Sequence, residues 1–417
     1  MVWLQLIYFS LLTLFFYRRD GRMNVATMLS LLYLITAVMA VGIDIFDLYG
    51  QFGVNKKVDS FWGTLIYCSG LTLVIYPFSK LRVSTTSFSL NNPKLFTITC
   101  YIMCICVLLY VTIHFSEIIY ALTTDAAEVK SQHYSDLQNG PVIGGQSLIM
   151  YPINILSSTW CFLMVCWFIS VIFLHKGIIF NTLLILCSLS GILKGSLEAG
   201  RAAIIYWLFS FCCFCCLFWP YIATPKLRRR IVLSVSIPIG LILLIFVSVT
   251  ISRFALGEHN GAWYSFVGYA GQQYNNFCAV FEYGRDLPFT IERIMPLTYK
   301  YAFGGNFDLM EYYENISVKT GITVNNFYTL LGGLYLTTGI PFTILCISIY
   351  NIFAMKICQK VSFTFNFSYL ILLSIIILVP VKGMFDVPFP YVGDTLVNFL
   401  LIGLFLLFKH SLNFNNK

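Results

Sequence analysis

The feature that most constrains this chain is a series of apolar runs, each long enough to cross a lipid bilayer. A bilayer-spanning helix needs about 20 mostly apolar residues. The composition agrees, because only 11% of the residues are charged, against about 25% in soluble proteins, and the mean hydropathy is +0.80. The sequence therefore predicts an all-α, polytopic membrane protein. Eleven runs qualify, at approximately 2–17, 23–43, 61–79, 95–121, 153–174, 178–193, 202–222, 231–252, 325–350, 361–380 and 395–408.

The charges between these runs predict the orientation. If the N-terminus lies outside, the inner segments hold fifteen basic residues and a single acid, Asp20. Cytoplasmic loops of membrane proteins are enriched in Lys and Arg. The separation of charge therefore predicts an N-out, C-in bundle of about eleven helices. It also accounts for the formal net charge of +8 without a nucleic acid as partner.

Two long connections stand out in this predicted bundle. We expect one transmembrane domain over residues 1–417, with a smaller external loop at 122–152 and a larger one at 253–324. Long loops in compact proteins are commonly functional or disordered, and the many aromatic residues of the larger loop argue against disorder. We expect this loop to fold back on the membrane surface as amphipathic helices.

Cysteine usage and missing motifs exclude several kinds of site. The fourteen cysteines lie almost entirely within the apolar runs, where cysteine acts as a small apolar packing residue. The sequence has no phosphate-binding loop of the form GxxxxGK[ST] and no HExxH motif. We therefore expect no disulfide framework, no metal and no other cofactor.

One polar stretch interrupts the apolar pattern: LKGSLEAGRAAIIYW, from Leu193 to Trp207. It puts Arg201 at the outer end of a predicted span, with Glu198 three residues before it. The planar and permanently charged guanidinium suits bidentate binding of phosphate or pyrophosphate. The alternative is an i,i+3 ion pair between Glu198 and Arg201, and the two roles are compatible.

The large loop adds cations and flat aromatic faces to the same side of the predicted bundle. Aromatic rings offer an apolar face, with a polar handle on Tyr and Trp, and such faces stack on sugar rings. Arginines above a lipid-facing bundle suit a lipid pyrophosphate that carries a glycan, and His259 is a candidate proton acceptor. Any single aromatic residue could instead belong to a belt at the membrane interface and bind no sugar. His259 could instead have a structural role and accept no proton. The loop candidates are Arg253, Arg285, Arg293 and Lys300 among the cations, and Trp263, Tyr264, Tyr269 and Tyr274 among the aromatics.

Two stretches resemble motifs of a known family. GSLEAGRAAIIYW has the small residues and the arginine that precede an apolar helix, and NNFYTLLGGLYLTTGIPFTIL (Asn325 to Leu345) is similar to the family's helix after the large loop. Together with the multi-span topology, they resemble the Wzy-type polymerases of O-antigen and oligosaccharide repeat units. Arg201 occupies the arginine position of the first motif, and Arg293 followed by Gly304 matches a second family spacing.

The resemblance implies a GT-C-like, metal-independent membrane glycosyltransferase of the bacterial inner membrane. It would transfer a growing glycan from undecaprenyl pyrophosphate onto a new lipid-linked repeat unit on the periplasmic face. Its partners would be the undecaprenyl-pyrophosphate-linked oligosaccharide, membrane lipid and a chain-length regulator. The catalytic candidates are then Arg201, Arg253, Arg293, Glu198 and His259, and the substrate-binding candidates are Arg285, Lys300, Trp263, Tyr264, Tyr269 and Tyr274.

Two other functions stay open. The O-antigen ligases carry a histidine motif in their large loop, which His259-Asn260 begins to match, although Ala270 stands where that motif has glycine. A flippase or transporter of lipid-linked oligosaccharides is the second alternative. Transporter folds often contain internal repeats and charged sites at the bilayer midplane. This chain has no evident repeat and carries its charges near the ends of the spans.

Overall fold

The computed structural model shows a helical protein. Among the residues it describes, every regular element is a helix, and the one β-type contact is an isolated bridge between Ser89 and Asn366. The expected all-α class is confirmed. The described residues are 1–82, 88–124, 150–197, 202–222, 262–284, 309–324, 327–387 and 392–410, with the shorter pieces 224–225, 227–229, 231, 236, 240, 244, 290 and 299.

The chain forms two compact units, each built from segments that are distant in sequence. Unit 1 comprises residues 1–82, 260–362 and 376–395, and unit 2 comprises residues 83–259, 363–375 and 396–417. The helices of unit 1 are α1 (Val2–Asp20), α2 (Val25–Phe46), α3 (Phe61–Ile75), η1 (Tyr76–Lys80), α13 (Ala262–Tyr283) and α15 (Leu309–Thr320), with nearly all of α16 (Thr329–Thr364). The helices of unit 2 are α4 (Pro93–Ile113), α5 (Phe115–Thr123), α7 (Met150–Ser157), α8 (Trp160–Ile169), η3 (Ser170–Leu174), α9 (Ile178–Cys187), α10 (Ser190–Leu197), α11 (Ala202–Phe218) and η4 (Trp219–Tyr221). The division between the units falls within α17 (Phe367–Lys382) and α18 (Val392–His410).

Seven helices in the described part of the chain are long and apolar enough to cross a membrane. An eighth candidate arises if α7 and the helix after it, which are bent by 53° at a short break, form one span. The protein is thus a multi-pass helical membrane protein. The count of eleven spans and the N-out orientation stay predictions, since most of the run 231–252 lies outside the described residues. The seven are α2, α3 with η1, α4, α9 with α10, α11 with η4, α16 and most of α18.

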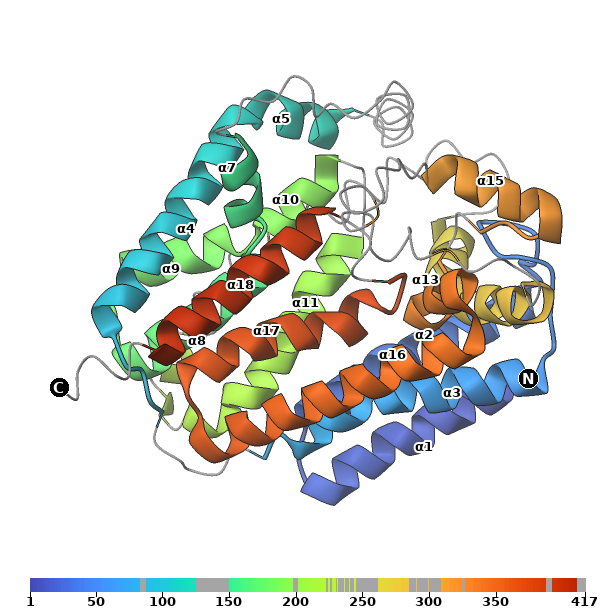
Figure 1. Cartoon of the computed structure of the whole chain (residues 1–417), viewed down its shortest axis with the longest axis horizontal. Helices are drawn as coiled ribbons and strands as arrows, with labels where there is room; N and C mark the ends of the chain where they lie inside the picture. The colour runs from blue at the N-terminus through green and yellow to red at the C-terminus, as the bar shows by residue number, and fades with distance from the viewer. Residues whose placement is uncertain are drawn as a thin grey trace. The chain divides into compact units, whose positions relative to one another are not determined.

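The first three helices of unit 1 pack against one another (Figure 1). The turn between α1 and α2 ends at Asn24, whose side-chain Oδ1 accepts a hydrogen bond from the backbone N–H of Thr27 at 2.8 Å. This cap satisfies one of the amide groups that a helix start leaves without an intrahelical partner. An aromatic core joins the helices, because the ring of Phe9 lies 5.9 Å from that of Tyr33 and 6.3 Å from that of Tyr67.

Helix α16 contains a sharp kink and runs further than the apolar pattern predicts. Gly339 has φ 67°, in the left-handed region, and Pro341 follows two residues later. Glycine adopts this conformation without the steric cost that a Cβ would bring. The sequence predicts two spans with a loop at 351–360, but α16 continues to Thr364. The reason is local, since residues 351–364 contain no Gly or Pro to end the helix.

Unit 2 is organised around α8. Every residue from Trp160 to Ile169 is buried, so this helix is surrounded by protein on all sides. Helices α4, α9 and α11 all contact it. The fourteen cysteines of the chain are free thiols, nine of them buried, in keeping with the packing role that their apolar surroundings predict.

Candidate functional site

The structure describes four of the eleven residues that the sequence analysis singles out. These four are aromatic residues of α13: Trp263, Tyr264, Tyr269 and Tyr274. The predicted cations and acid–base residues lie outside the described residues, so their roles stay predictions. This second group consists of Glu198, Arg201, Arg253, His259, Arg285, Arg293 and Lys300.

Helix α13 lies within the predicted large loop, yet it is a buried helix and not one that rests on a surface. It packs along α2 and also contacts α3, at the end of these helices that carries the N-terminus (Figure 1). Residues 270–281 are all buried. The close approach depends on Gly271, because a Cβ at this position would lie 2.5 Å from the backbone carbonyl carbon of Met39. We expected amphipathic helices on the membrane surface, and for α13 that expectation is wrong.

Buried side-chain amides hold α13 in this position. The side-chain oxygen of Asn276 accepts hydrogen bonds from the backbone N–H of Asn55 at 2.9 Å and from its side-chain amide at 3.1 Å. The side-chain Nδ2 of Asn276 donates to the carbonyls of Gly53 at 3.0 Å and Phe327 at 3.1 Å. A buried amide without partners is costly, so α13 is stable here only because the loop after α2 and the segment before α16 supply these partners.

A second asparagine extends this network to the next part of the loop. Asn275 donates from Nδ2 to the carbonyl of Asn55 at 2.9 Å, and Asn55 in turn accepts at Oδ1 from the backbone N–H of Thr323 at 2.9 Å. Three segments are thus joined through side-chain amides, and the segment with Asn55 lies more than 200 residues before the other two. Gln273 is fully buried, and its Oε1 has no hydrogen-bond partner among the described residues.

The four predicted sugar-binding aromatics differ in their surroundings. Tyr274 is buried, and its hydroxyl lies 2.6 Å from Oγ1 of Thr64. Tyr269 packs against Phe327, with 5.1 Å between the ring centroids, and Tyr264 packs edge-on against Phe46 at 5.1 Å. Trp263, at the start of α13, is 56% exposed. In this conformation Trp263 is the member of the four with the largest face available for stacking on a ligand.

A small polar cavity opens beside α13. Its volume is about 80 Å³, well below the roughly 300–1,000 Å³ of pockets that enclose a whole small ligand. It therefore suits part of a ligand, such as the hydroxyl-bearing edge of a sugar. Its polar lining consists of Asp44, Tyr49, Lys57, Asp59, Tyr274 and Asn275.

The charges in this cavity are held in a fixed arrangement. Lys57 Nζ forms an ion pair with Oδ1 of Asp44, which also accepts a hydrogen bond from the hydroxyl of Tyr49 at 3.0 Å. The hydrogen bond with Asp44 raises the pKa of Lys57. Burial, followed by the same carboxylate, raises the pKa of Tyr49 above its ordinary range. At neutral pH Lys57, Asp44 and Tyr49 therefore present an ammonium, a carboxylate and a neutral phenol to the cavity, which is a mixed set of donors and acceptors.

In unit 2, the described part of the LKGSLEAGR motif contains a second polar cluster. Lys194 Nζ donates to the carbonyl of Asn154 at 2.7 Å and to Oγ of Ser158 at 2.6 Å, and it lies 4.4 Å from the ring centroid of Tyr110. A partly buried ammonium needs such partners, because the loss of hydration is otherwise uncompensated. The motif therefore includes a cation fixed by α4 and α7, seven residues before Arg201 in sequence.

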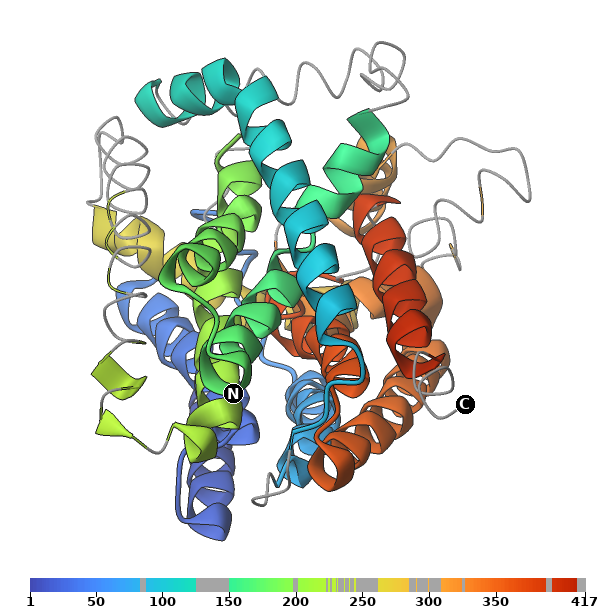
Figure 2. The same cartoon turned by 90° about the vertical axis from the view of Figure 1, so that its left-hand side faces the viewer.

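The same cluster includes a histidine that the sequence analysis does not single out. His114 lies between the end of α4 and the start of α5, and Figure 2 shows that α5 turns away from α4. The His114 ring is 4.6 Å from that of Tyr110. Its Nδ1 is 2.6 Å from Oε2 of Glu117, and its Nε2 is buried without a hydrogen-bond partner among the described residues. A glutamate three residues after a histidine is the sequence signal for this pair.

The paired glycines of the second family-like stretch have a packing role. A Cβ on Gly333 would lie 2.3 Å from Cγ2 of Val387 and 3.0 Å from Oδ1 of Asp386. The segment after α17 therefore packs directly on the backbone of α16. The backbone N–H of Leu330 also donates to the carbonyl of Gly383 at 2.8 Å.

The described residues contain no group of three or more His, Cys, Asp or Glu side chains arranged to hold a metal ion. Comparison of the chain with protein-family models and curated proteins, and of the structure with solved structures, gives no match.

Proposed function

We propose that this membrane protein polymerises lipid-linked oligosaccharide repeat units, in the manner of the Wzy-type polymerases that its sequence resembles. In this reaction a hydroxyl of the acceptor repeat unit attacks the anomeric carbon of the growing glycan. The bond from that carbon to undecaprenyl pyrophosphate breaks, and a glycosidic bond forms. The proton of the hydroxyl passes to a base, and the pyrophosphate leaves as an anion that needs positive charge nearby.

The observation that carries the proposal is the position of α13. A helix of the large hydrophilic loop is fixed to the membrane helices beside a cavity lined with charges, hydroxyls and an amide. Glycans are bound by such groups together with aromatic faces, and the exposed Trp263 supplies one on the same helix. A rigid polar wall at a helix-bundle end suits a substrate whose lipid stays in the bilayer while its sugars lie outside.

The proposed roles of the residues follow from their chemistry. Arg201, Arg253 and Arg293 would stabilise the departing pyrophosphate, and His259 or Glu198 would accept the proton. The fixed ammonium of Lys194 supports this assignment for the LKGSLEAGR motif. Arg285, Lys300 and the aromatic residues of α13 would bind the glycan. The protein would work in the bacterial inner membrane with its active site towards the periplasm.

A second candidate function is favoured by the broken helices. The bend of 53° after α7 and the kink at Gly339 of α16 interrupt two membrane segments. Transporters often use discontinuous helices at their binding sites, so a flippase of lipid-linked oligosaccharides is the alternative. It would move the same class of substrate without forming a glycosidic bond.

Deletion of the gene in a host that makes the surface polysaccharide separates these functions. If the protein is a polymerase, its deletion should remove long polysaccharide chains from the gel and leave single repeat units attached to the lipid core. If the protein is a flippase or a ligase, its deletion should remove all lipid core that carries repeat units.

In the complemented strain, Arg201→Ala and Arg201→Lys are both expected to abolish long chains, because lysine lacks the bidentate fork. Arg229→Ala, at an exposed arginine, is the matched control. Long chains of normal length from Arg201→Ala would refute the catalytic role.

A further inference from the structure

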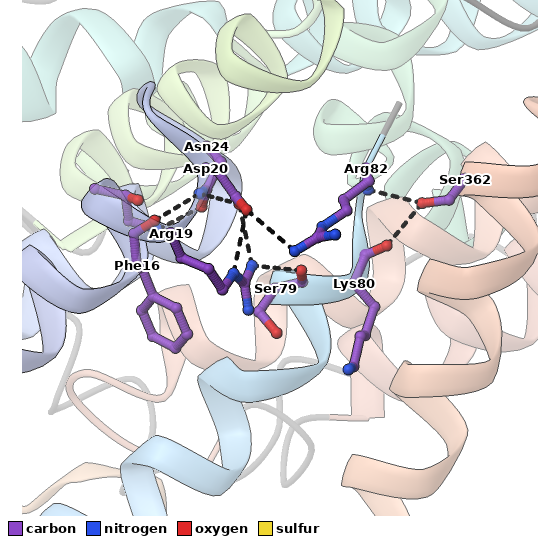
Figure 3. A network of polar contacts seen from close by, with 9 residues as sticks. Phe16, Arg19, Asp20, Asn24, Ser79, Lys80, Arg82 and Ser362 are labelled. Atoms are coloured by element: carbon purple, nitrogen blue, oxygen red, sulfur yellow. Dashed lines mark hydrogen bonds and ion pairs between the residues drawn. The ribbon is translucent and has the colours of Figure 1, made fainter. Parts of the chain in front are cut away.

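Several basic side chains gather at one end of unit 1. The turn between α1 and α2 reads Arg18-Arg19-Asp20-Gly21-Arg22, and the helix pair α3–η1 ends in Lys80-Leu81-Arg82. Figure 3 shows that the guanidinium groups of Arg19 and Arg82 both point at the carboxylate of Asp20. We call the five basic side chains of these two segments the basic cluster: Arg18, Arg19, Arg22, Lys80 and Arg82.

Hydrogen bonds fix the backbone of this cluster. Arg19 forms a two-pronged contact with Asp20, through Nε at 3.1 Å and Nη2 at 3.0 Å, and its Nη2 also donates to the carbonyl of Ser79 at 2.6 Å. The hydroxyl of Ser362, on α16, accepts from the backbone N–H of Arg82 at 2.9 Å and donates to the carbonyl of Lys80 at 2.8 Å (Figure 3). The turn, the end of η1 and the end of α16 are therefore held together in one arrangement.

The cluster carries more positive than negative charge. Asp20 is the acid that contacts it, and this side chain already accepts hydrogen bonds from Arg19 and Asn24 and forms an ion pair with Arg82. The contact of Arg82 with it is long, at 3.5 Å, and the Arg82 side chain is 69% exposed. An arginine has five N–H donors in a planar fork, so most donors of Arg82 are available to an external anion. Arg18 and Arg22 are also exposed.

The surroundings of the cluster indicate where such an anion comes from. On α1, the side chains of Leu11, Leu14 and Phe15 are 62%, 43% and 56% exposed, within two turns of Arg18. On α16, Ile352 and Phe353 are similarly exposed, about three turns before Ser362. In a multi-pass membrane protein, exposed apolar side chains of this kind contact acyl chains. A cation cluster directly beyond them lies at the depth of the lipid phosphates.

We propose that the basic cluster binds the phosphate headgroup of an anionic phospholipid, with Arg22 and Arg82 as its main external contacts. Two guanidinium groups drawn to one carboxylate repel each other, and a lipid phosphate relieves this repulsion while its acyl chains cover the apolar face of α1. The inference concerns the membrane contact of the protein and is independent of the reaction that it performs. It assigns to the cluster a bound lipid in addition to the orienting effect of basic loops.

The test measures the thermal unfolding midpoint of the purified full-length protein in a mild detergent, titrated with short-chain phosphatidylglycerol or phosphatidylcholine. Phosphatidylglycerol is expected to raise the midpoint of the wild-type protein more than phosphatidylcholine does, because a ligand that binds the folded state stabilises it. In the double variant Arg22→Gln, Arg82→Gln, the apparent affinity for phosphatidylglycerol should fall about 25-fold, about fivefold for each arginine. Lys319→Gln, at an exposed lysine of α15, should keep the wild-type affinity.

The design separates lipid binding from a folding defect. Both replaced side chains are exposed, and the backbone N–H of Arg82 still donates to Ser362, so the double variant should unfold near the wild-type midpoint without lipid. An unchanged response of the double variant to phosphatidylglycerol would overturn the proposal, as would equal responses of the wild type to the two lipids. Equal protection by inorganic phosphate at the same concentration would also overturn it, because the cluster would then be a site for a free anion.

Discussion

Replacement of Gly271 by alanine should displace α13 from α2. The added Cβ would lie 2.5 Å from the carbonyl carbon of Met39 and 2.6 Å from the backbone nitrogen of Ala40. Because these are backbone atoms, no side chain can move to make room, and the helices must separate by roughly 1 Å to reach ordinary contact. Overpacking of this kind costs about 1–3 kcal/mol. A gap of that size also removes a quarter to a half of the dispersion attraction between each pair of contacting atoms. We expect the docked state of α13 to lose about 3 kcal/mol.

Cys278 provides the assay for this displacement. It lies on α13 with no exposed surface, and burial raises the pKa of its thiol to about 12, so it should react very slowly with a maleimide at neutral pH. A loss of about 3 kcal/mol corresponds to roughly a 100-fold larger open population and to a similar increase in labelling at Cys278 when opening is fast. Peptide mass spectrometry distinguishes Cys278 from the other thirteen cysteines.

The control for this experiment is Gly403→Ala. Gly403 lies in α18 with no atom within 4 Å of a built Cβ, and alanine is the better helix former. This variant should leave the labelling of Cys278 unchanged. If Cys278 of the Gly271→Ala variant also labels at the wild-type rate, then α13 does not pack closely against the backbone of α2.

Three further predictions concern the polar contacts. Asn276→Ala should lower the thermal unfolding midpoint, because each buried backbone partner left unpaired costs about 1–3 kcal/mol; Asn315→Ala, at an exposed position of α15, should not. Lys194→Met should also lower the midpoint, because the ammonium's hydrogen bonds to the Asn154 carbonyl and to Ser158 Oγ are lost, each worth about 1.5–3 kcal/mol for a charged donor, whereas Lys356→Met at an exposed site should have little effect. Finally, the folded-state pKa values of Lys57 and Tyr49 lie above their ordinary values of 10.5 and 10.0. Their contribution to the free energy of unfolding is therefore complete below about pH 10 and is lost as pH rises through the folded-state pKa values. The double variant Lys57→Met, Tyr49→Phe should show a flatter decline of the unfolding midpoint between pH 9 and 11.5.

The sequence predicts the membrane helices well because their signal is local. Length and apolar character alone locate α2 and α11 within a few residues of their observed bounds, whereas the predicted run 95–121 joins α4 to most of α5. The kink of α16 is also readable, since Gly339 and Pro341 stand together in an otherwise apolar run. The continuation of α16 to Thr364 was missed because Lys356 and Lys360 make residues 351–364 resemble a loop, although nothing in the backbone ends the helix there.

The burial of α13 could not be predicted from its own residues. The run Gln272-Gln273-Tyr274-Asn275-Asn276 has the composition of a surface segment. It becomes a core segment only because Asn55 and the carbonyl of Gly53, more than 200 residues earlier, supply its hydrogen bonds. Polar partners at such a distance leave no periodic pattern. For the Lys194 cluster, the sequence shows the motif around Lys194 but gives no signal for its contacts to α4 and α7.

For the basic cluster too, the sequence predicts which side of the membrane the residues share but not which atoms they contact. The partition of charge predicts that Arg19, Lys80 and Arg82 share one side of the bundle, and the structure brings them to one end of unit 1. The role of Ser362 in joining these segments has no sequence signal, because a serine at the end of a helix is common. Single polar contacts between distant segments are visible only in three dimensions.

The asparagine network of α13 also has a consequence for how the protein is made. Asn55 and Asn276 are 221 residues apart, so α1, α2 and α3 leave the ribosome long before α13 has been synthesised. Until then the backbone and side chain of Asn55 must be hydrated or held by an insertion factor. Unit 1 also needs residues 376–395, so its assembly is completed only after this segment has been synthesised. A ribosome stalled between residues 100 and 260 would therefore hold α1, α2 and α3 without the later segments that complete the core of unit 1, and such chains should be the preferred substrates of membrane quality-control proteases.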